Sequence, residues 1–250
     1  MNNIDFIYNL LKYYGKYKKV HIEKLYIENN IKQTIYNLRK EQKKYKLVKD
    51  AYSYPKNKKR AIEKLKILYP FIKGSKNILD FGGGSCDISF VIGKTLKLDK
   101  KDILCSDLEK FGNIKWEHNP NITFIPSNKL SIIPDNSIDT IFAFYVFHHI
   151  PNKVLKNIVN ELYRILKPNG LLIIQEHNSP NKQFAEKLDL QHIIYDVVLS
   201  QETTYDKFMK TYISNYKSIE QWNKVLKKFK LYKIIKLKSL TKNYFGLYKK

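Results

Sequence analysis

The sequence predicts an α/β fold with a doubly wound, mostly parallel sheet. Short apolar runs alternate with amphipathic segments between residues 77 and 180, and this alternation is typical of βαβ units. The first apolar run leads directly into Gly82, Gly83 and Gly84. A length of 250 residues with 43% hydrophobic content is enough for one such domain with an added helical region.

The middle of the chain carries the alternating pattern. Strands are expected at residues 78–81, 102–105, 122–125, 138–145 and 171–174, with helices at 88–96 and 152–166 and a turn at 168–170. The tail continues with helical segments at 181–199 and 219–229 and with strands at 232–237 and 244–248. These last two strands are expected to form a hairpin at the edge of the sheet.

The N-terminal region has a different pattern. Apolar residues such as Ile31, Ile35 and Leu38 recur at helical spacing, with charged residues on the other faces. A further helix is expected over residues 61–68, closed by Pro70 and Gly74. We therefore expect residues 1–74 to form a basic helical lid and residues 75–250 to form the α/β domain.

The charge is strongly basic and unevenly distributed. The formal net charge is +23; residues 1–77 hold 20 Lys and Arg against 6 Asp and Glu, residues 78–179 hold 11 of each, and residues 180–250 hold 15 against 6. Basic flanks attract a polyanion such as nucleic acid. Lysine outnumbers arginine by 43 to 3, however, and an AT-rich genome would produce the same bias without any ligand.

Other features of the sequence limit the expected partners, compartment and metal content. No run of about 18 apolar residues occurs, so no membrane partner is expected, and the first residues lack the plan of a secretory signal. Cys86 and Cys105 are too few for a disulfide scaffold and fit a reducing, cytoplasmic compartment. Without paired Cys and His spacings, no metal site is expected.

Acidic residues accompany the glycines. A carboxylate at Asp80 would repel a pyrophosphate but suits a cationic amino group. Asp107, at the end of the second strand, can accept hydrogen bonds from both hydroxyls of a ribose. The third glycine of the dinucleotide fingerprint is absent, because Asp87 stands there. The glycines also suit a plain tight turn, but the whole pattern favours S-adenosylmethionine over a dinucleotide.

Four segments resemble the class I S-adenosylmethionine-dependent methyltransferases. They are residues 78–90 (ILDFGGGSCDISF), 106–109 (SDLE), 132–150 (IIPDNSIDTIFAFYVFHHI) and 161–177 (ELYRILKPNGLLIIQEH). Their order and spacing match the first motif, the second-strand acid, the fourth strand and the helix, turn and fifth strand of that family. The resemblance implies a seven-stranded sheet with a terminal antiparallel strand.

The resemblance also implies roles for individual residues. Gly82, Gly83 and Gly84 would lie against the methionine part of the cofactor, with Asp80 near its amino group. Asp107 would hold the ribose.

Three further residues complete the expected cofactor site. Leu108 would flank the adenine, and Phe144 would lie at the end of the fourth strand. The family often has an acid that faces the adenine amine; here Asn128 is the expected substitute. Cys86 replaces the third glycine of the family's first motif, which leaves open weak cofactor binding or an inactive relative.

Candidate catalytic residues follow the fourth and fifth strands. They are His148, Glu176 and His177, at the edge where an open α/β sheet binds its ligand. His148 also fits a packing or capping role. Downstream, Asp189, His192 and Tyr195 share one face of a helix, either lining the same pocket or forming a polar surface.

These features lead to one expected function and two alternatives. The expected function is S-adenosylmethionine-dependent methylation of RNA, with the 5′ cap as a candidate acceptor. The alternatives are a small-molecule methyltransferase with a lysine-rich surface, and a degenerate subunit that binds RNA or a partner subunit. The Glu–His pair with its following helix looks similar to methyltransferase-like proteins of large DNA viruses, which implies the host cytoplasm. The oligomeric state stays open.

Overall fold

The protein consists of two compact units. The computed structural model describes residues 2–12, 18–45, 54–108, 122–201 and 203–250. One unit combines residues 1–51 with residues 179–214, and the other combines residues 52–178 with residues 215–250. The boundary expected after residue 74 therefore differs from the observed grouping, because residues 52–74 belong with the sheet and residues 179–214 belong with the N-terminal helices. Whether these helices act as a lid stays a prediction.

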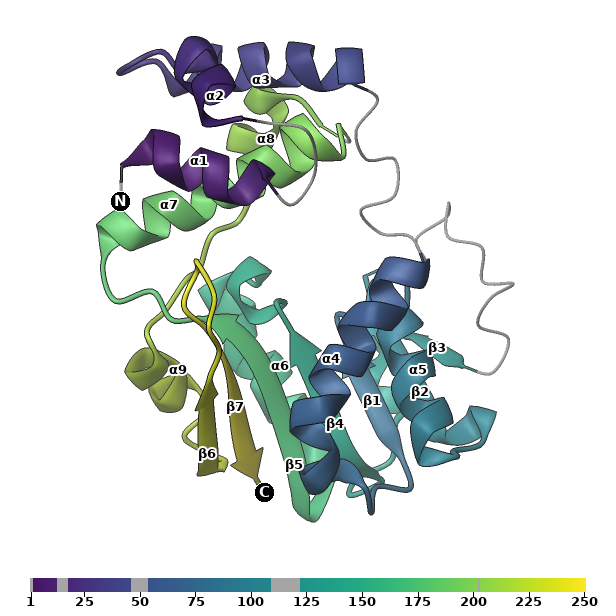
Figure 1. Ribbon diagram of the computed structural model, residues 1–250. Coiled ribbons are helices and arrows are strands. Elements are labelled where there is room, and N and C mark those ends of the chain that lie inside the picture. Colours follow the sequence, from purple (N-terminus) through teal and green to yellow (C-terminus); the bar gives the residue numbers. More distant parts are fainter. Residues whose placement is uncertain (1, 13–17, 46–53, 109–121, 202) are drawn as a thin grey trace. The chain divides into compact units, whose positions relative to one another are not determined.

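The larger unit is built on a seven-stranded sheet (Figure 1). The strands are β1 (Ile78–Phe81), β2 (Ile103–Asp107), β3 (Thr123–Pro126), β4 (Ile138–Phe144), β5 (Leu166–His177), β6 (Lys230–Lys236) and β7 (Asn243–Lys249). Their order is β3-β2-β1-β4-β5-β7-β6. The first five strands run parallel, and β7 is antiparallel to both β5 and β6. The predicted fold class and the terminal hairpin are confirmed.

Helices cover both faces of this sheet. Helices α4 (Tyr54–Ile72) and α5 (Asp87–Leu96) pack on one face, and α6 (Asn152–Ile165) and α9 (Ile219–Val225) pack on the other. Helix α6 packs on the sheet through an apolar stripe. Leu155, Val159 and Leu162 recur at helical spacing and are all buried. Three short 3₁₀ segments, η1 (Lys100–Asp102), η3 (Ser127–Ile132) and η4 (Phe147–His149), lie next to the strands.

The smaller unit is helical. It contains α1 (Asn3–Leu11), α2 (Lys19–Leu25), α3 (Ile31–Tyr45), α7 (Lys182–Ile193), the π-helical segment η5 (Ile194–Leu199) and α8 (Tyr205–Thr211). An ion pair of 2.6 Å between Lys32 and Asp206 links its two parts of the chain, and Arg39 donates to the carbonyl oxygen of Thr203 at 2.6 Å. Among the described residues, no helix combines the length and apolarity needed to cross a lipid bilayer.

Two element boundaries differ from the sequence-based expectation. Helix α4 continues through Pro70 to Ile72, so the proline that was expected to close the helix lies inside it, where it has no N–H to donate to the carbonyl of Lys66. Strand β5 begins at Leu166, so the expected turn at residues 168–170 lies inside it. A register shift between Ile138 and Thr140 of β4 accommodates this irregular start.

The two cysteines are joined. A disulfide connects Cys86, before α5, to Cys105 in β2, with a Cα–Cα distance of 5.9 Å. The two cysteines are too few for a scaffold, as expected, but they are paired and not reduced in this structure; the compartment stays a prediction. The pairing of β1 with β2 places Asp80 opposite Cys105, and the loop after β1 returns Cys86 to the same place.

This disulfide should stabilise the fold. The two cysteines are 19 residues apart, and closing a loop of this length stabilises a protein by about 3 kcal/mol in the chain-entropy model. We therefore expect a reductant to lower the free energy of unfolding by about that amount. Urea unfolding followed by circular dichroism, with and without reductant, measures the difference. Coincident curves would contradict the prediction, and the double variant Cys86→Ala/Cys105→Ala should not respond to reductant.

Candidate active site

The loop after β1 depends on its glycines. Gly82 and Gly84 have φ values of +72° and +54°, which L side chains rarely adopt. A Cβ on Gly82 would also lie 2.3 Å from a methyl carbon of Val146. The backbone N–H groups of Gly82 and Gly83 donate to the carbonyl oxygen of Ser106 at 2.7 and 3.1 Å. The glycine loop is thereby fixed to the end of β2.

Asp107 holds the far side of this loop. Its Oδ2 accepts from the backbone N–H of Gly84 at 2.8 Å, and its Oδ1 accepts from the backbone N–H of Leu108 at 2.7 Å. The Leu108 side chain is 83% exposed. A Cβ on Gly84 would meet no described atom within 4 Å. Bare backbone therefore faces open space beside an acid, which fits the ribose and amino-acid parts of S-adenosylmethionine.

Asp80 lies beneath the loop. Its carboxylate is buried and accepts from the Ser89 hydroxyl at 2.7 Å, and burial raises the pKa of this side chain to about 6. A Cβ on Gly83 would lie 2.6 Å from the Sγ of Cys105 and 2.9 Å from Oδ2 of Asp80. Two of the predicted cofactor residues, Asp80 and Gly83, are thus packed against each other, and the loop has no room for a side chain at Gly83.

The remaining predicted cofactor residues lie in two places. Asn128 is exposed on η3, directly after β3, and therefore follows a strand at the same edge as the glycine loop. The Phe144 ring packs between Phe142 and Phe245, at centroid distances of 5.5 and 6.0 Å. Phe144 is thus part of an aromatic cluster on the α4 face. A cofactor contact for either residue stays a prediction.

Glu176 and His148 form a buried pair. Oε1 of Glu176 accepts from the backbone N–H of Phe147 at 2.9 Å, and Oε2 shares a 2.5 Å hydrogen bond with Nδ1 of His148. Burial raises the pKa of Glu176 and lowers the pKa of His148, so both groups are shifted toward their neutral forms. The pair holds the η4 turn in place at the end of β4, which is a positioning role. Whether either group contacts a substrate stays a prediction.

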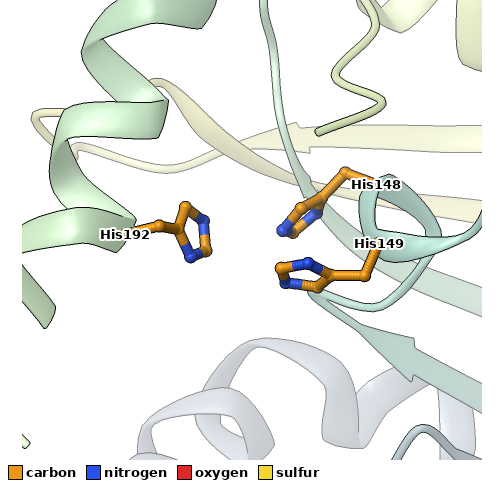
Figure 2. Close-up of side chains that lie close together, drawn as sticks. All are labelled: His148, His149 and His192. Atoms are coloured by element: carbon orange, nitrogen blue, oxygen red, sulfur yellow. The ribbon is translucent and has the colours of Figure 1, made fainter. Parts of the chain in front are cut away.

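His177 completes this cluster on β5. Its Nδ1 lies 2.7 Å from Oδ1 of Asn243 on β7, and burial lowers its pKa to about 4. Its ring lies 5.3 Å from the ring of His148, which in turn stacks on Tyr216 at 5.1 Å. Figure 2 shows His148 with His149 on the η4 turn. The structure thus brings together all three predicted catalytic residues.

The downstream polar residues belong to the helical unit. Asp189 and His192 lie on α7 (Figure 2 labels His192), and Tyr195 lies on η5. The change from α to π geometry between these elements alters the helical spacing that was expected to align the three residues. The His192 ring packs against Tyr212 at 5.3 Å. Their expected contribution to the acceptor pocket stays a prediction.

Lys64 is a basic residue at this edge of the sheet that no sequence motif indicated. This α4 residue donates to Oε1 of Gln175 on β5, and Nε2 of Gln175 donates to the Tyr145 hydroxyl at 2.9 Å. Helical spacing in residues 61–68 could have placed Lys64 on the same side of the helix as Arg60, but no pattern in the sequence indicates that this side faces β5.

The Glu176 pair yields a test of its positioning role. Glu176→Ala leaves the Phe147 N–H and His148 without their partner, so we expect the free energy of unfolding to fall by about 2–4 kcal/mol. Glu176→Gln keeps an acceptor for Phe147 and should cost less than half as much. Urea unfolding of both variants measures the difference. Equal losses, or no loss with alanine, would show that these hydrogen bonds do not hold the turn.

Comparisons with known proteins agree with this geometry. A ubiquinone/menaquinone biosynthesis C-methyltransferase from Hahella chejuensis is 27% identical over 123 residues, covering 46% of this chain and 49% of that protein. A ubiquinone biosynthesis O-methyltransferase from Rickettsia akari is 26% identical over 150 residues, covering 60% and 59%. The chain thus matches only about half of the length of these relatives.

The fold and the family comparison lead to one assignment. The crystal structure of a SAM-dependent methyltransferase from Archaeoglobus fulgidus superimposes with a TM-score of 0.54 at 12% identity, over 77% of this chain and 94% of that one. This likeness supports the fold. A family model described as a methyltransferase domain matches residues 72–239, which is more than half of the chain. The chain therefore belongs to the methyltransferase-domain family of class I S-adenosylmethionine-dependent enzymes.

Proposed function

We propose that this protein transfers a methyl group from S-adenosylmethionine to a small organic acceptor. The observation that carries the proposal is the bare backbone at Gly84, held between the buried Asp80 and the edge residue Asp107. The names of the relatives, which concern ubiquinone and menaquinone biosynthesis, favour a small acceptor over RNA.

The residues of the site suit this cofactor. When bound, its sulfonium supplies an electrophilic methyl group. The Asp80 carboxylate favours the cationic amino group, and each oxygen of Asp107 keeps a lone pair for a ribose hydroxyl beside its backbone hydrogen bond. The exposed Leu108 offers an apolar side for the adenine. Positioning contributes much of the rate in such a displacement, and a base is needed only when the acceptor must lose a proton.

RNA methylation is the second candidate, because the chain is basic at both ends. Residues 1–77 and 180–250 together hold 35 of the 46 Lys and Arg residues. A phosphate backbone would bind there with release of counterions. This candidate differs from the first in its salt dependence.

Cofactor binding tests the first step of the proposal. We expect S-adenosylhomocysteine to bind the wild-type protein. The substitutions Asp80→Asn and Asp107→Ala should each weaken this binding by about tenfold or more. Because Asp80 ionises only above a pH of about 6, the affinity should rise as the pH rises through that value. Calorimetry at several pH values measures both effects.

A matched control separates these effects from a loss of charge anywhere in the chain. Asp99 is exposed, and Asp99→Ala should bind S-adenosylhomocysteine as the wild type does. If Asp80→Asn and Asp107→Ala also bind normally while they remain folded, the site assignment is wrong. No binding by the wild type would support the degenerate alternative.

The acceptor class is tested by transfer of a labelled methyl group. Small phenols and quinols are compared with short capped and uncapped RNAs, at low and at physiological salt. We expect label on a small molecule with little salt dependence. Label on RNA that falls steeply with salt would favour the second candidate instead.

A further inference from the structure

A pocket of about 340 Å³ opens beside the aromatic cluster of the sheet unit. It is lined by Arg60, Glu63, Lys64 and Ile67 of α4, Tyr145 after β4, Gln175 of β5, Leu237 after β6 and Phe245 of β7. Tyr145 and Gln175 lie at the carboxyl ends of their strands, where open α/β sheets bind ligands. The volume is within the range of small-molecule sites.

Aromatic rings surround the amine of Lys64 in this pocket. The Nζ atom lies 4.5 Å from the ring centroid of Phe144, 5.5 Å from that of Tyr145 and 5.6 Å from that of Phe245. Its hydrogen bond to Gln175 fixes the side chain. The pocket therefore presents a held cation beside flat apolar surfaces.

The groups around this amine shift its pKa in opposite directions. Burial is the main reason that the pKa of Lys64 falls to about 7; the cation Arg60 acts in the same direction, and the carboxylates of Asp80 and Glu63 oppose the shift. Tyr145 also lines the pocket, and burial raises the pKa of its hydroxyl, so that it stays protonated. An anion that enters the pocket would draw a proton onto Lys64, because it stabilises the charged form.

The combination selects for one kind of ligand. Rings on the pocket wall favour a planar aromatic molecule through stacking and edge contacts. Two basic side chains, Lys64 and Arg60, favour a negative charge on that molecule. Glu63 also lines the pocket, and its negative charge would oppose an anion there.

We propose that this pocket is the acceptor site and that it binds a planar aromatic anion, an aryl carboxylate or a phenolate, through Lys64 and Arg60. That the pocket holds the methyl acceptor rests on the proposed function, whereas binding of the anion can be measured without methyl transfer.

The test uses para-hydroxybenzoate as the probe. Calorimetry is performed on the full chain loaded with S-adenosylhomocysteine. We expect the wild type to bind the probe. Lys64→Met should bind it more weakly by about tenfold or more, because a charged hydrogen-bond partner is lost. The neutral analogue para-hydroxybenzyl alcohol should bind the wild type more weakly by a similar factor. Lys66→Met, an exposed position on the same helix, is the matched control and should bind the probe normally.

Each contrary result has one meaning. Equal binding of the alcohol and the benzoate, an unchanged Lys64→Met variant, or no binding of the benzoate to the wild type would overturn the inference. Loss of S-adenosylhomocysteine affinity in Lys64→Met would place Lys64 in the cofactor site and overturn it as well. If the wild type fails to bind S-adenosylhomocysteine, the proposed function fails, and titration of the unloaded chain still tests the pocket.

A second measurement needs no variant. Binding of para-hydroxybenzoate at a pH slightly above 7 should take up protons, since the free Lys64 is only partly charged there. Calorimetry in two buffers with different ionisation enthalpies counts these protons. The affinity should fall as the pH rises above about 7, because the neutral amine no longer attracts the anion. No proton uptake together with a flat pH profile would overturn the inference, even if Lys64→Met does not fold.

Discussion

The parallel pairing of β1 with β2 is the interaction on which the rest of the candidate site depends. It places Asp80 opposite Cys105 and Phe81 opposite Ser106. The Ser106 carbonyl oxygen can then accept from the backbone N–H groups of the glycine loop. The same pairing brings Asp107 to the N–H of Gly84. One change of register would separate all of these groups, because successive side chains of a strand point to opposite faces.

Burial divides the predicted site residues at the carboxyl edge into two groups. Glu176, His148 and His177 are buried, and they form hydrogen bonds with neighbouring turns and strands. Desolvation favours the neutral forms of such groups, which suits residues that hold the frame of a site. Leu108 and Asn128 are exposed at the ends of β2 and β3. The cofactor is expected to contact these exposed residues together with the open backbone at Gly84 and the buried Asp80.

Helix α4 shows how a basic segment can acquire a specific role. The chain has 43 lysines, and their number alone assigns no specific role to any one of them. Lys64 differs because the packing of α4 on the sheet places its amine among Phe144, Tyr145 and Phe245. Lys66, two positions further along, points away and is exposed. Its surroundings, not its residue type, give Lys64 a pKa near neutrality.

The sequence by itself determined the α/β class, the order of the strands along the chain and the glycine loop between Asp80 and Asp107. Those features are local, since apolar periodicity and glycine content act within a few residues. Tertiary structure decided the Cys86–Cys105 disulfide, the grouping of residues 179–214 with the N-terminal helices, and the contacts of Lys64 and Glu176. These contacts join segments far apart in the sequence, so their partners, and the desolvation that shifts their pKa values, exist only after the sheet and helices have packed.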